Sequence, residues 1–597
     1  MKQDEFTRQV EYHTDDLKAY EAVSNRVGYV KLVMVMLLGV LIYFLFAWGF
    51  PVVLVIVGVV GFVGLIFLWV YHHKIHEKLS RAKGLIAINK RHLARILGEW
   101  TAFIDTGAEF ACREHPYSSD LDIVGGKSLF QFLNTTHTWH GRQAFARALL
   151  EPGFSEDEIV HRQEAIRELS QDIEFSTSME YSFSKIGSHN AADKLVAELG
   201  DGSVFTESRV GKYLLMYMPL LTLTIIAGAM IFGHISLLIG AICAVALQGL
   251  AWLIGMGTAH RYVGAVSSRL PYKLGAYTQV IDILQVKNFD SIKIQEIQDK
   301  LRATDVSAKE AIVALGKIVD RVNIRHNALI WFGVNVLLLW DFWCAISFEK
   351  WKLKYAHRVE GWFTALGEFE GLLSFSNFPN VCGNTSLPVI VREKAIRASK
   401  LGHPLISNAT RVNNDFVCDD NIFILSGSNM SGKTTFMRTV GINLVLARAG
   451  SFVCAREMSF ALVEIMTSMR VADDLNEGIS TFYAELKRIK AIIEFSKKEP
   501  RMLFLIDEIF RGTNSVDRLS GAKTVLAKLD NLGAIGVITT HDLELCEIAA
   551  FYPRIENYSF SEEYRDGQIC FDYVIRDGKS TSTNAKYLME MVGITHG

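Results

Sequence analysis

The sequence is poor in cysteine and proline, with 8 Cys and 10 Pro among 597 residues. These low counts, with only 45 Gly, exclude a collagen-like chain, a disulfide-stapled scaffold and a low-complexity disordered chain. No two cysteines form a Cys-x-x-Cys pair, so we expect reduced thiols in a reducing compartment and no zinc site. The net charge is only −2, and any nucleic-acid surface must therefore be a local patch.

Charge is also missing locally, from two long stretches of the chain. Residues 32–71 contain no Asp, Glu, Lys or Arg, and a turn-like segment at 48–51 divides them. Residues 213–259 are equally uncharged and divide near Gly233. Each stretch is long enough for two membrane spans, whereas buried core helices rarely sustain such runs in tandem. We therefore predict two transmembrane hairpins, and the charged residues before the first one exclude a signal peptide.

Basic residues predict the orientation of both hairpins. Lys and Arg lie on the outer flanks and are absent from the turns between spans. The positive-inside rule then places every sizeable soluble segment in the cytoplasm of a multi-pass protein of the cytoplasmic (inner) membrane. A third apolar run, 328–348, contains Asp341 and three Trp, and is either a buried lever helix or another membrane contact. We favour burial, because an odd span would put the C-terminal part outside.

The pattern of apolar and polar residues in the rest of the sequence predicts a multidomain chain, with transmembrane hairpins, an all-α core and lever, and a C-terminal α/β domain. Residues after 379 alternate short apolar runs with helical segments, which is typical of a largely parallel sheet. In the helical part, the spacing of Ile312, Leu315, Val319 and Val322 predicts one buried helix face. The predicted order is an N-terminal cytoplasmic segment (1–31), the first hairpin (32–71), a helical linker (72–118), the first part of a helical core (119–212), the second hairpin (213–259), a helical lever or second part of the core (260–378) and the α/β domain (379–597).

A glycine-rich loop carries the clearest chemical signal. A predicted buried strand, 421–425, leads into a GxxxxGK[ST] pattern, and a helix-like segment, 435–448, follows. In this pattern backbone N–H groups wrap phosphates at a helix N-terminus, a lysine reaches the β and γ oxygens, and a hydroxyl ligates Mg²⁺. The predicted nucleotide-binding residues are Gly427, Ser428, Asn429, Met430, Ser431, Gly432, Lys433, Thr434 and Thr435.

Two further strand ends complete the predicted site for ATP and Mg²⁺. The strand 502–506 ends in Asp507 and Glu508; the first can hold Mg²⁺ together with Thr434, and the second can polarise the attacking water. The strand 535–538 runs toward His541, which can approach the γ-phosphate or be merely structural. Glu508, His541 and Lys433 are thus the predicted catalytic residues.

Taken together, these motifs resemble the MutS family of ATPases. The loop with its Asn429-Met430 pair is similar to that family's Walker A motif, and the resemblance continues through 450–453, 470–475, 478–482 with Glu485, 507–513 and 540–541. It extends upstream to His403-Pro404 and, more weakly, to residues 121–150, which look like the start of the MutS core. The resemblance covers about 430 residues, with the C-terminal two hundred the most specific.

The resemblance implies an ABC-superfamily-like P-loop domain that hydrolyses ATP with Mg²⁺ in a homodimer. It also implies roles for three residues: Ser480 would reach the partner's nucleotide across a composite site, Asn429 would lie near the phosphates, and His541 would sense the γ-phosphate. DNA is the partner that the resemblance implies.

The N-terminal part departs from the family. Mismatch-recognising members carry a Phe-x-Glu wedge on an N-terminal domain, and the first 118 residues here leave no room for it, so we expect mismatch specificity to be absent. Phe154-Ser155-Glu156 fits the pattern, but we predict that it begins a helix. Two alternatives stay open: a membrane scaffold that merely binds ATP, and an ABC-type transporter, whose signature should precede the Asp507 strand, whereas Leu519-Ser520-Gly521 follows it.

Overall fold

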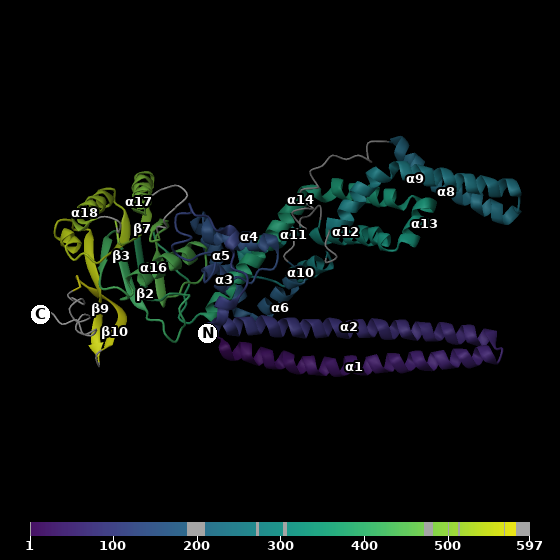
Figure 1. Cartoon of the computed structure of the whole chain (residues 1–597), viewed down its shortest axis with the longest axis horizontal. Helices are drawn as coiled ribbons and strands as arrows, with labels where there is room; N and C mark the ends of the chain where they lie inside the picture. The colour runs from purple at the N-terminus through teal and green to yellow at the C-terminus, as the bar shows by residue number, and fades with distance from the viewer. Residues whose placement is uncertain are drawn as a thin grey trace. The chain divides into compact units, whose positions relative to one another are not determined.

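A computed structural model of the chain describes residues 2–187, 209–269, 274–302, 307–470, 481–499, 501–510, 514–565 and 568–580. Contacts divide the chain into two units that interleave in sequence (Figure 1). Unit 1 comprises residues 1–134, 146–181 and 375–597, and unit 2 comprises 135–145 and 182–374. The chain is therefore multidomain and mostly helical outside its C-terminal part.

Two long antiparallel helices begin unit 1. They are α1 (Gln3–Ala47) and α2 (Pro51–Leu97), and both are long and apolar enough to cross a membrane (Figure 1). Between residues 32 and 71 their apolar side chains point outward, while a Cβ placed on Gly61 would clash with Leu38 of the facing helix. Small residues at a helix contact with apolar residues outside are typical of helices packed in lipid. Both helices continue well beyond the uncharged run on which the prediction of a first hairpin rested.

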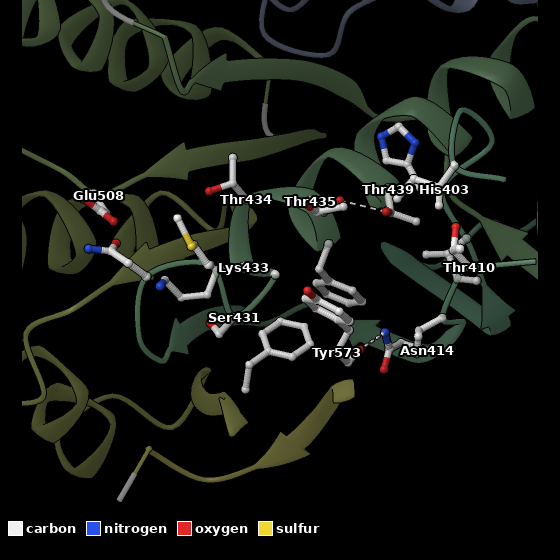
Figure 2. Close-up of a pocket in the computed structure, with 18 residues that line it drawn as sticks. His403, Thr410, Asn414, Ser431, Lys433, Thr434, Thr435, Thr439, Glu508 and Tyr573 are labelled. Carbon is white, nitrogen blue, oxygen red and sulfur yellow. Dashed lines mark hydrogen bonds between the residues drawn. The ribbon is translucent and has the colours of Figure 1, made fainter. Parts of the chain in front are cut away.

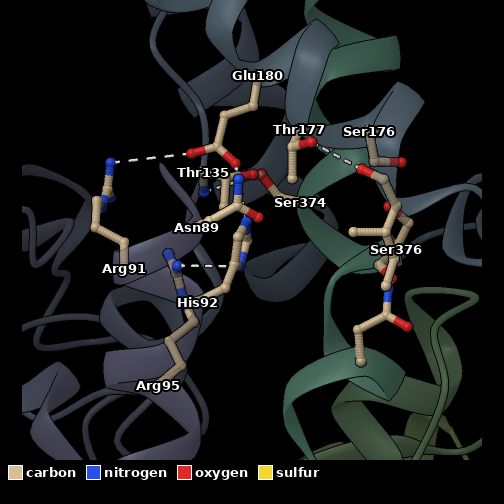
Figure 3. Close-up of polar contacts among 12 residues, drawn as sticks. Asn89, Arg91, His92, Arg95, Thr135, Ser176, Thr177, Glu180, Ser374 and Ser376 are labelled. Atoms are coloured by element: carbon tan, nitrogen blue, oxygen red, sulfur yellow. Dashed lines mark hydrogen bonds and ion pairs between the residues drawn. The ribbon is translucent and has the colours of Figure 1, made fainter. Parts of the chain in front are cut away.

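The last turns of α2 are held in unit 1 by buried polar groups (Figure 3). The Arg95 guanidinium donates to the backbone carbonyls of Phe132 (2.7 Å) and Asn134 (2.8 Å). His92 Nε2 lies 3.2 Å from a Glu180 carboxylate oxygen, and the Arg91 guanidinium is 4.0 Å from the other oxygen. Burial lowers the pKa of Arg95 to about 9, so its charge is retained at neutral pH.

Short helices form the described residues from 99 to 184 of the predicted linker and of the first part of the core. Ser155 caps one of them, α5, by accepting a hydrogen bond from the Glu158 N–H, which confirms that Phe154-Ser155-Glu156 begins a helix. The Phe154 ring lies under the Arg162 guanidinium, 4.3 Å from the ring centre. The elements are η1 (Glu99–Ala102), η2 (Ala108–Phe110), α3 (Leu129–Leu133), α4 (Trp139–Leu150), α5 (Glu156–Gln171) and α6 (Ile173–Ser184).

Unit 2 is helical throughout its described part. The expected stripe on α12 (Ala308–Val322) is buried at all four positions, which confirms that prediction. The run 328–348 is broken into α13 and the start of α14, with a bend of 81° between the two helices. The other elements are α8 (Arg209–Phe232), α9 (Ile235–Arg269), α10 (Leu274–Val286), α11 (Ile292–Arg302), η3 (Asn323–His326), α13 (Ala328–Leu338) and α14 (Trp340–Ser376).

The C-terminal α/β domain of unit 1 contains two sheets and confirms the predicted class of this region. The six-stranded sheet has the order β10-β9-β4-β8-β7-β6 and is parallel except for β10. The second sheet has the order β1-β5-β2-β3. The strands are β1 (Val389–Ile390), β2 (Ala395–Leu401), β3 (Asn414–Asp419), β4 (Ile422–Ser426), β5 (Glu457–Phe460), β6 (Glu464–Ser468), β7 (Met502–Asp507), β8 (Ile535–Thr540), β9 (Ile555–Arg565) and β10 (Gln568–Asp577). The helices are α15 (Phe378–Val381), α16 (Lys433–Arg448), α17 (Thr481–Lys498), α18 (Ser515–Asn531) and η4 (Leu545–Ala550).

The register of the parallel strands determines where polar residues meet. Ser426 at the end of β4 pairs with Thr540 of β8, and Asp507 at the end of β7 pairs with Thr539. The interior residues of β4, β7 and β8 are buried, as their apolar sequences require. The loop after β4 and the ends of β7 and β8 therefore lie together at the carboxyl edge of the sheet, where open α/β sheets bind ligands.

Candidate functional site

The glycine loop joins β4 directly to the N-terminus of α16. Gly427 and Gly432 have φ values of 148° and 105°, which residues with a Cβ rarely adopt. A Cβ on Gly427 would also lie 3.0 Å from the Phe560 carbonyl oxygen and from Ser431 Oγ. Lys433 is the first residue of α16, and its ammonium donates to the carbonyls of Gly427 (2.9 Å) and Ser428 (2.7 Å). The loop thus holds its lysine at a helix N-terminus.

Asp507 joins the loop to the neighbouring strands. Its Oδ1 accepts hydrogen bonds from the hydroxyls of Thr434 (3.0 Å) and Thr539 (2.6 Å). The carboxylate is nearly buried, which restricts its orientation. A carboxylate beside a hydroxyl at a strand end is an oxygen-rich arrangement of the kind that Mg²⁺ prefers.

Glu508 and His541 form a close pair next to Asp507. His541 Nε2 lies 2.5 Å from Glu508 Oε1, and His541 Nδ1 lies 2.9 Å from the Gly427 carbonyl oxygen. A carbonyl oxygen can only accept, so His541 Nδ1 is the donor in its contact with Gly427, and Nε2 faces the Glu508 carboxylate. Glu508 has a left-handed backbone, with φ 50°, and its N–H donates to the Thr539 hydroxyl (3.1 Å).

A third acidic residue supports the segment after Glu508. Glu485 on α17 is buried and accepts a hydrogen bond from the Phe510 N–H. The Phe510 ring packs edge-on against Phe482 of the same helix, with centroids 5.8 Å apart. The segment that carries Glu508 is therefore fixed by α17, the helix that follows the 478–480 segment of the resemblance.

A cavity of about 460 Å³ opens beside the loop (Figure 2). Its lining runs from Glu508 and the glycine loop to a second group of side chains: Leu401, His403, Ile406, Thr410, Val412, Asn414, Phe436, Thr439, Phe560 and Tyr573. Burial lowers the pKa of His403 to about 4, with the Arg438 charge adding to the effect, so its imidazole is neutral at pH 7. The far wall of the cavity is therefore uncharged and largely apolar.

Tyr573 enters this wall from a distant part of the sequence. It lies in an irregularity of β10 between Phe571 and Ile575, with φ 55°, and its ring would touch a Cβ on Gly432 at 3.0 Å. The Asn414 amide holds the irregularity on both sides, donating to the Tyr573 carbonyl (3.0 Å) and accepting from the Ile575 N–H (2.9 Å). Figure 2 shows Tyr573 between the glycine loop and Asn414.

The residues of the site fit a triphosphate and a divalent cation. Ser431 Oγ is buried and has no hydrogen-bond partner among the described residues, so it is available to a ligand in the loop. The loop offers backbone N–H groups and one ammonium for phosphate, while Thr434 and Asp507 offer oxygens for Mg²⁺.

Sequence reasoning located most of these residues but missed several. The predicted residues 427–435, 507, 508 and 541 lie together, whereas the predicted Ser480 is outside the described residues. Asn429 and Met430 are exposed and line the cavity. Tyr573 and Asn414 were missed, as was Glu562, whose carboxylate accepts from the Ser428 hydroxyl (2.7 Å). No motif marks these three residues, because only the pairing of distant strands brings them to the loop.

The architecture and the site define a class: a multidomain helical chain whose C-terminal α/β domain carries a GxxxxGK[ST] loop at its carboxyl edge. Residues 423–596 match the family of MutS domain V. The C-terminal domain of the chain is therefore a MutS family domain, and the match does not extend beyond it.

Three relatives illustrate the extent of the similarity. The DNA mismatch repair protein MutS of Chloroflexus aurantiacus is 29% identical over 247 residues, which are 40% of this chain and 25% of that protein. Its namesake in Methanococcoides burtonii is 31% identical over 226 residues, 36% of this chain and 25% of that protein. The human MutS protein homolog 4 is 34% identical over 168 residues, 27% of this chain and 18% of that protein. The chain thus matches about a quarter of the length of the two MutS proteins.

Proposed function

We propose that this protein is a membrane-anchored, MutS-like ATPase that hydrolyses MgATP in a homodimer and couples the nucleotide state to a grip on DNA. The observation that carries the proposal is the convergence of Lys433, Asp507 and the Glu508–His541 pair at one edge of the sheet. A scaffold that only bound ATP would have no use for this acidic residue paired with a histidine beside the loop.

In the proposed site the phosphates lie in the glycine loop and the base lies toward Tyr573. Lys433 exchanges its two carbonyl partners for β and γ oxygens, a stronger, charge-assisted interaction. Thr434 and Asp507 would hold Mg²⁺, whose charge would neutralise those oxygens. The uncharged wall around His403 and Tyr573 accepts an aromatic base.

Glu508 and His541 divide the hydrolytic work. Glu508 orients the attacking water and accepts its proton, and His541 donates toward the γ-phosphate. Because the two side chains are paired, His541 holds Glu508 in place until His541 turns toward the phosphate. The pairing therefore links the release of the Glu508 carboxylate, the proposed general base, to the binding of ATP.

The partners follow from the family and from the apolar helices. Ser480 would complete the partner's site in the dimer, DNA would be held through its phosphates, and the two hairpins would anchor the protein in the cytoplasmic membrane. The support for the anchor is the length and outward apolar surface of α1 and α2.

Two variants of the detergent-solubilised protein test the proposal. Glu508→Gln keeps the shape of the side chain but cannot accept a proton, so ATP binding should persist while turnover falls by about 10²–10⁴-fold. Lys433→Ala should instead lose tight ATP binding, because it removes the positive charge of the loop. Nucleotide titration and phosphate release distinguish the two effects, and wild-type turnover of Glu508→Gln would contradict the assignment. Adding duplex DNA to the turnover assay tests the coupling, which predicts a changed rate.

A further inference from the structure

The apolar helix α13 exposes large side chains although it lies in the middle of a folded unit. Leu329 is 87% exposed, and Ile330 and Phe332 are more than half exposed. The neighbouring helices α8 and α9 show the same outward apolar surface, at Leu220, Leu221, Met230, Ile231, Phe232, Ile235, Leu238, Ile239, Ile242, Leu247, Leu250 and Leu253. Within unit 2, α13 contacts both α8 and α9 (Figure 1), and all three helices have exposed apolar side chains.

A buried glutamine joins α13 to the hairpin. Gln248 of α9 is 0% exposed; its Oε1 accepts from the Thr222 hydroxyl of α8 (2.6 Å), and its Nε2 donates to the Leu337 carbonyl (2.7 Å). One side chain therefore bridges three helices. Polar side chains that satisfy each other between helices, with apolar residues facing outward, are the pattern of packing in lipid.

The contacts also establish how deep α13 reaches. α9 starts at Ile235, beside the turn of the second hairpin, and Gln248 lies roughly 20 Å further along the helix. The hydrocarbon core of a bilayer is about 30 Å thick, so Gln248 lies within the thickness that the hairpin would cross. Leu337 meets Gln248 at that level, whereas Trp331 stacks edge-on against Trp252, one helical turn nearer the base of the hairpin (5.4 Å between centroids). Along its sequence α13 therefore runs inward, toward the tip of the hairpin.

The chain turns back directly after α13. Leu339 has a left-handed backbone, with φ 52°, and clusters with Phe342 and Trp252, so α14 begins at the shallower level again. Asp341 is buried and ion-paired with Arg325, which precedes α13 (2.9 Å). At about 16 Å, α13 is too short to span a bilayer.

Two backbone N–H groups at the break are satisfied by Asn335. The Leu339 N–H donates to the Asn335 carbonyl (2.9 Å), and the Asp341 N–H donates to the Asn335 side-chain oxygen (2.9 Å). Trp331 Nε1 donates to the Asp341 carboxylate (3.1 Å). Irregular backbone is tolerated at membrane depth only where protein satisfies it in this way.

We propose that residues 328–348 are a re-entrant membrane segment, which enters the bilayer along the second hairpin, turns at Leu339 and leaves on the side from which it came. The partner of its exposed face is the acyl region of the lipid, and this inference rests on the proposed membrane anchor. It replaces the preference, drawn from sequence, for a buried lever helix. A re-entrant path also removes the objection that an odd span would export the ATPase domain.

Depth measurements with spin labels test the proposal on the full chain in liposomes of phosphatidylethanolamine and phosphatidylglycerol. Single cysteines replace Leu329 and, as a matched control, Leu353, which is 64% exposed on α14 beside Lys352 and Lys354, in a background lacking the exposed Cys112, Cys243 and Cys570. Oxygen concentrates in hydrocarbon and a nickel chelate stays in water. The ratio of oxygen to nickel accessibility should be several-fold higher at Leu329→Cys than at Leu353→Cys. Equal ratios would overturn the inference.

Further labels distinguish failure of the proposed re-entrant segment from failure of the proposed membrane anchor. Leu238→Cys reports on the second hairpin. If its label is accessible from water, the proposed membrane anchor is wrong. If the Leu238 label lies in lipid while the Leu329 label is accessible from water, only the re-entrant segment is wrong. Tyr12→Cys and Leu353→Cys should both resist an impermeant maleimide in intact cells and react once the cells are opened. Labelling of Leu353→Cys from outside would show a complete span and would also overturn the inference.

Discussion

Four residues other than glycine have left-handed backbone around the candidate site: Met430, Glu508, Phe510 and Tyr573. Such conformations cost about 1–3 kcal/mol each and persist only where surrounding contacts determine them. The Thr539 hydroxyl holds the N–H of Glu508, and Glu485 holds that of Phe510. The Asn414 amide holds the backbone around Tyr573. These four residues thus have strained backbone where the proposed chemistry needs fixed geometry.

The position of Tyr573 leads to a prediction about nucleotide affinity. Tyr573→Ala removes an aromatic face from the proposed base side of the cavity and should weaken ATP binding about tenfold, as expected for loss of roughly 1–1.5 kcal/mol of stacking. Tyr573→Phe keeps the ring and should bind ATP as the wild type does. Fluorescence titration with a labelled ATP analogue measures both variants. Equal affinities for ATP and inorganic triphosphate in the wild type would contradict a role for the base.

A second prediction concerns Glu370 of unit 2. Burial raises its pKa to about 7, although its carboxylate faces His137 and accepts hydrogen bonds from the His137 and Thr138 N–H groups. The pKa of Glu370 in the folded protein lies above the ordinary value of 4.5. The contribution of its neutral carboxyl group to the free energy of unfolding is therefore complete below pH 4.5 and is lost as the pH rises through 7. Thermal unfolding of the wild type should therefore show this loss, of about 3 kcal/mol at most.

The corresponding variant isolates the effect of this carboxyl group. Glu370→Gln cannot ionise and should flatten the decrease in unfolding temperature between pH 5 and pH 8. Glu360→Gln, at an exposed position of the same helix, should leave the wild-type slope unchanged. An unchanged slope in Glu370→Gln would show that another group titrates.

The sequence predicted those residues of the candidate site that belong to a short local motif. Lys433, Thr434, Asp507 and Glu508 follow from short patterns at strand ends, because phosphate and Mg²⁺ chemistry restricts the residue types there. Tyr573 carries no such restriction: it is one of 19 tyrosines and reaches the loop through an irregularity in β10. Contacts of this kind depend on strand register, which no local pattern in the sequence specifies.

At the scale of elements, the junction between α2 and the helical core depends on few polar groups. The apolar run predicted the hairpin, but its charged continuation through residue 97 lies beyond that signal. The sequence around Arg95, His92 and Glu180 is typical of the exposed faces of helices. These side chains are nevertheless buried, because α6 and the 132–134 segment pack against α2. Burial of charge is a tertiary property that composition does not show.

This junction provides a third prediction. Arg95→Ala leaves the carbonyls of Phe132 and Asn134 without their donor, so it should lower the free energy of unfolding by roughly 2–5 kcal/mol. Arg91→Ala is the matched control: Arg91 is half-exposed on the same helix and should cost no more than about 1 kcal/mol. Denaturant unfolding in detergent measures both. Equal losses would mean that the Arg95 hydrogen bonds do not determine the stability of the junction.

At the scale of the whole molecule, the proposed grip on DNA should not distinguish a mismatch. Wedge recognition needs an apolar side chain free to unstack a base step. Phe154, whose sequence context fits such a wedge, lies under Arg162 at the start of α5. What remains for the proposed function is contact with phosphates, which weakens steeply with salt.

A competition assay at fixed ionic strength measures this fourth prediction. Two duplexes that differ by one G·T pair should compete equally for the protein. A preference of about tenfold, or 1.4 kcal/mol, for the mismatched duplex would show that another side chain performs the unstacking.

The interleaving of the two units has a consequence for biosynthesis. Unit 1 contains the first hairpin and also everything after residue 375, while most of unit 2 is encoded between them. A ribosome therefore completes α1 and α2 hundreds of residues before the sheet that completes their unit exists. During that interval α1 and α2 lack contacts that later segments supply, such as the hydrogen bond from the Lys2 backbone N–H to the Asn380 carbonyl (2.9 Å). The order of synthesis thus sets the order of assembly, because unit 1 can be completed only after unit 2 has been translated.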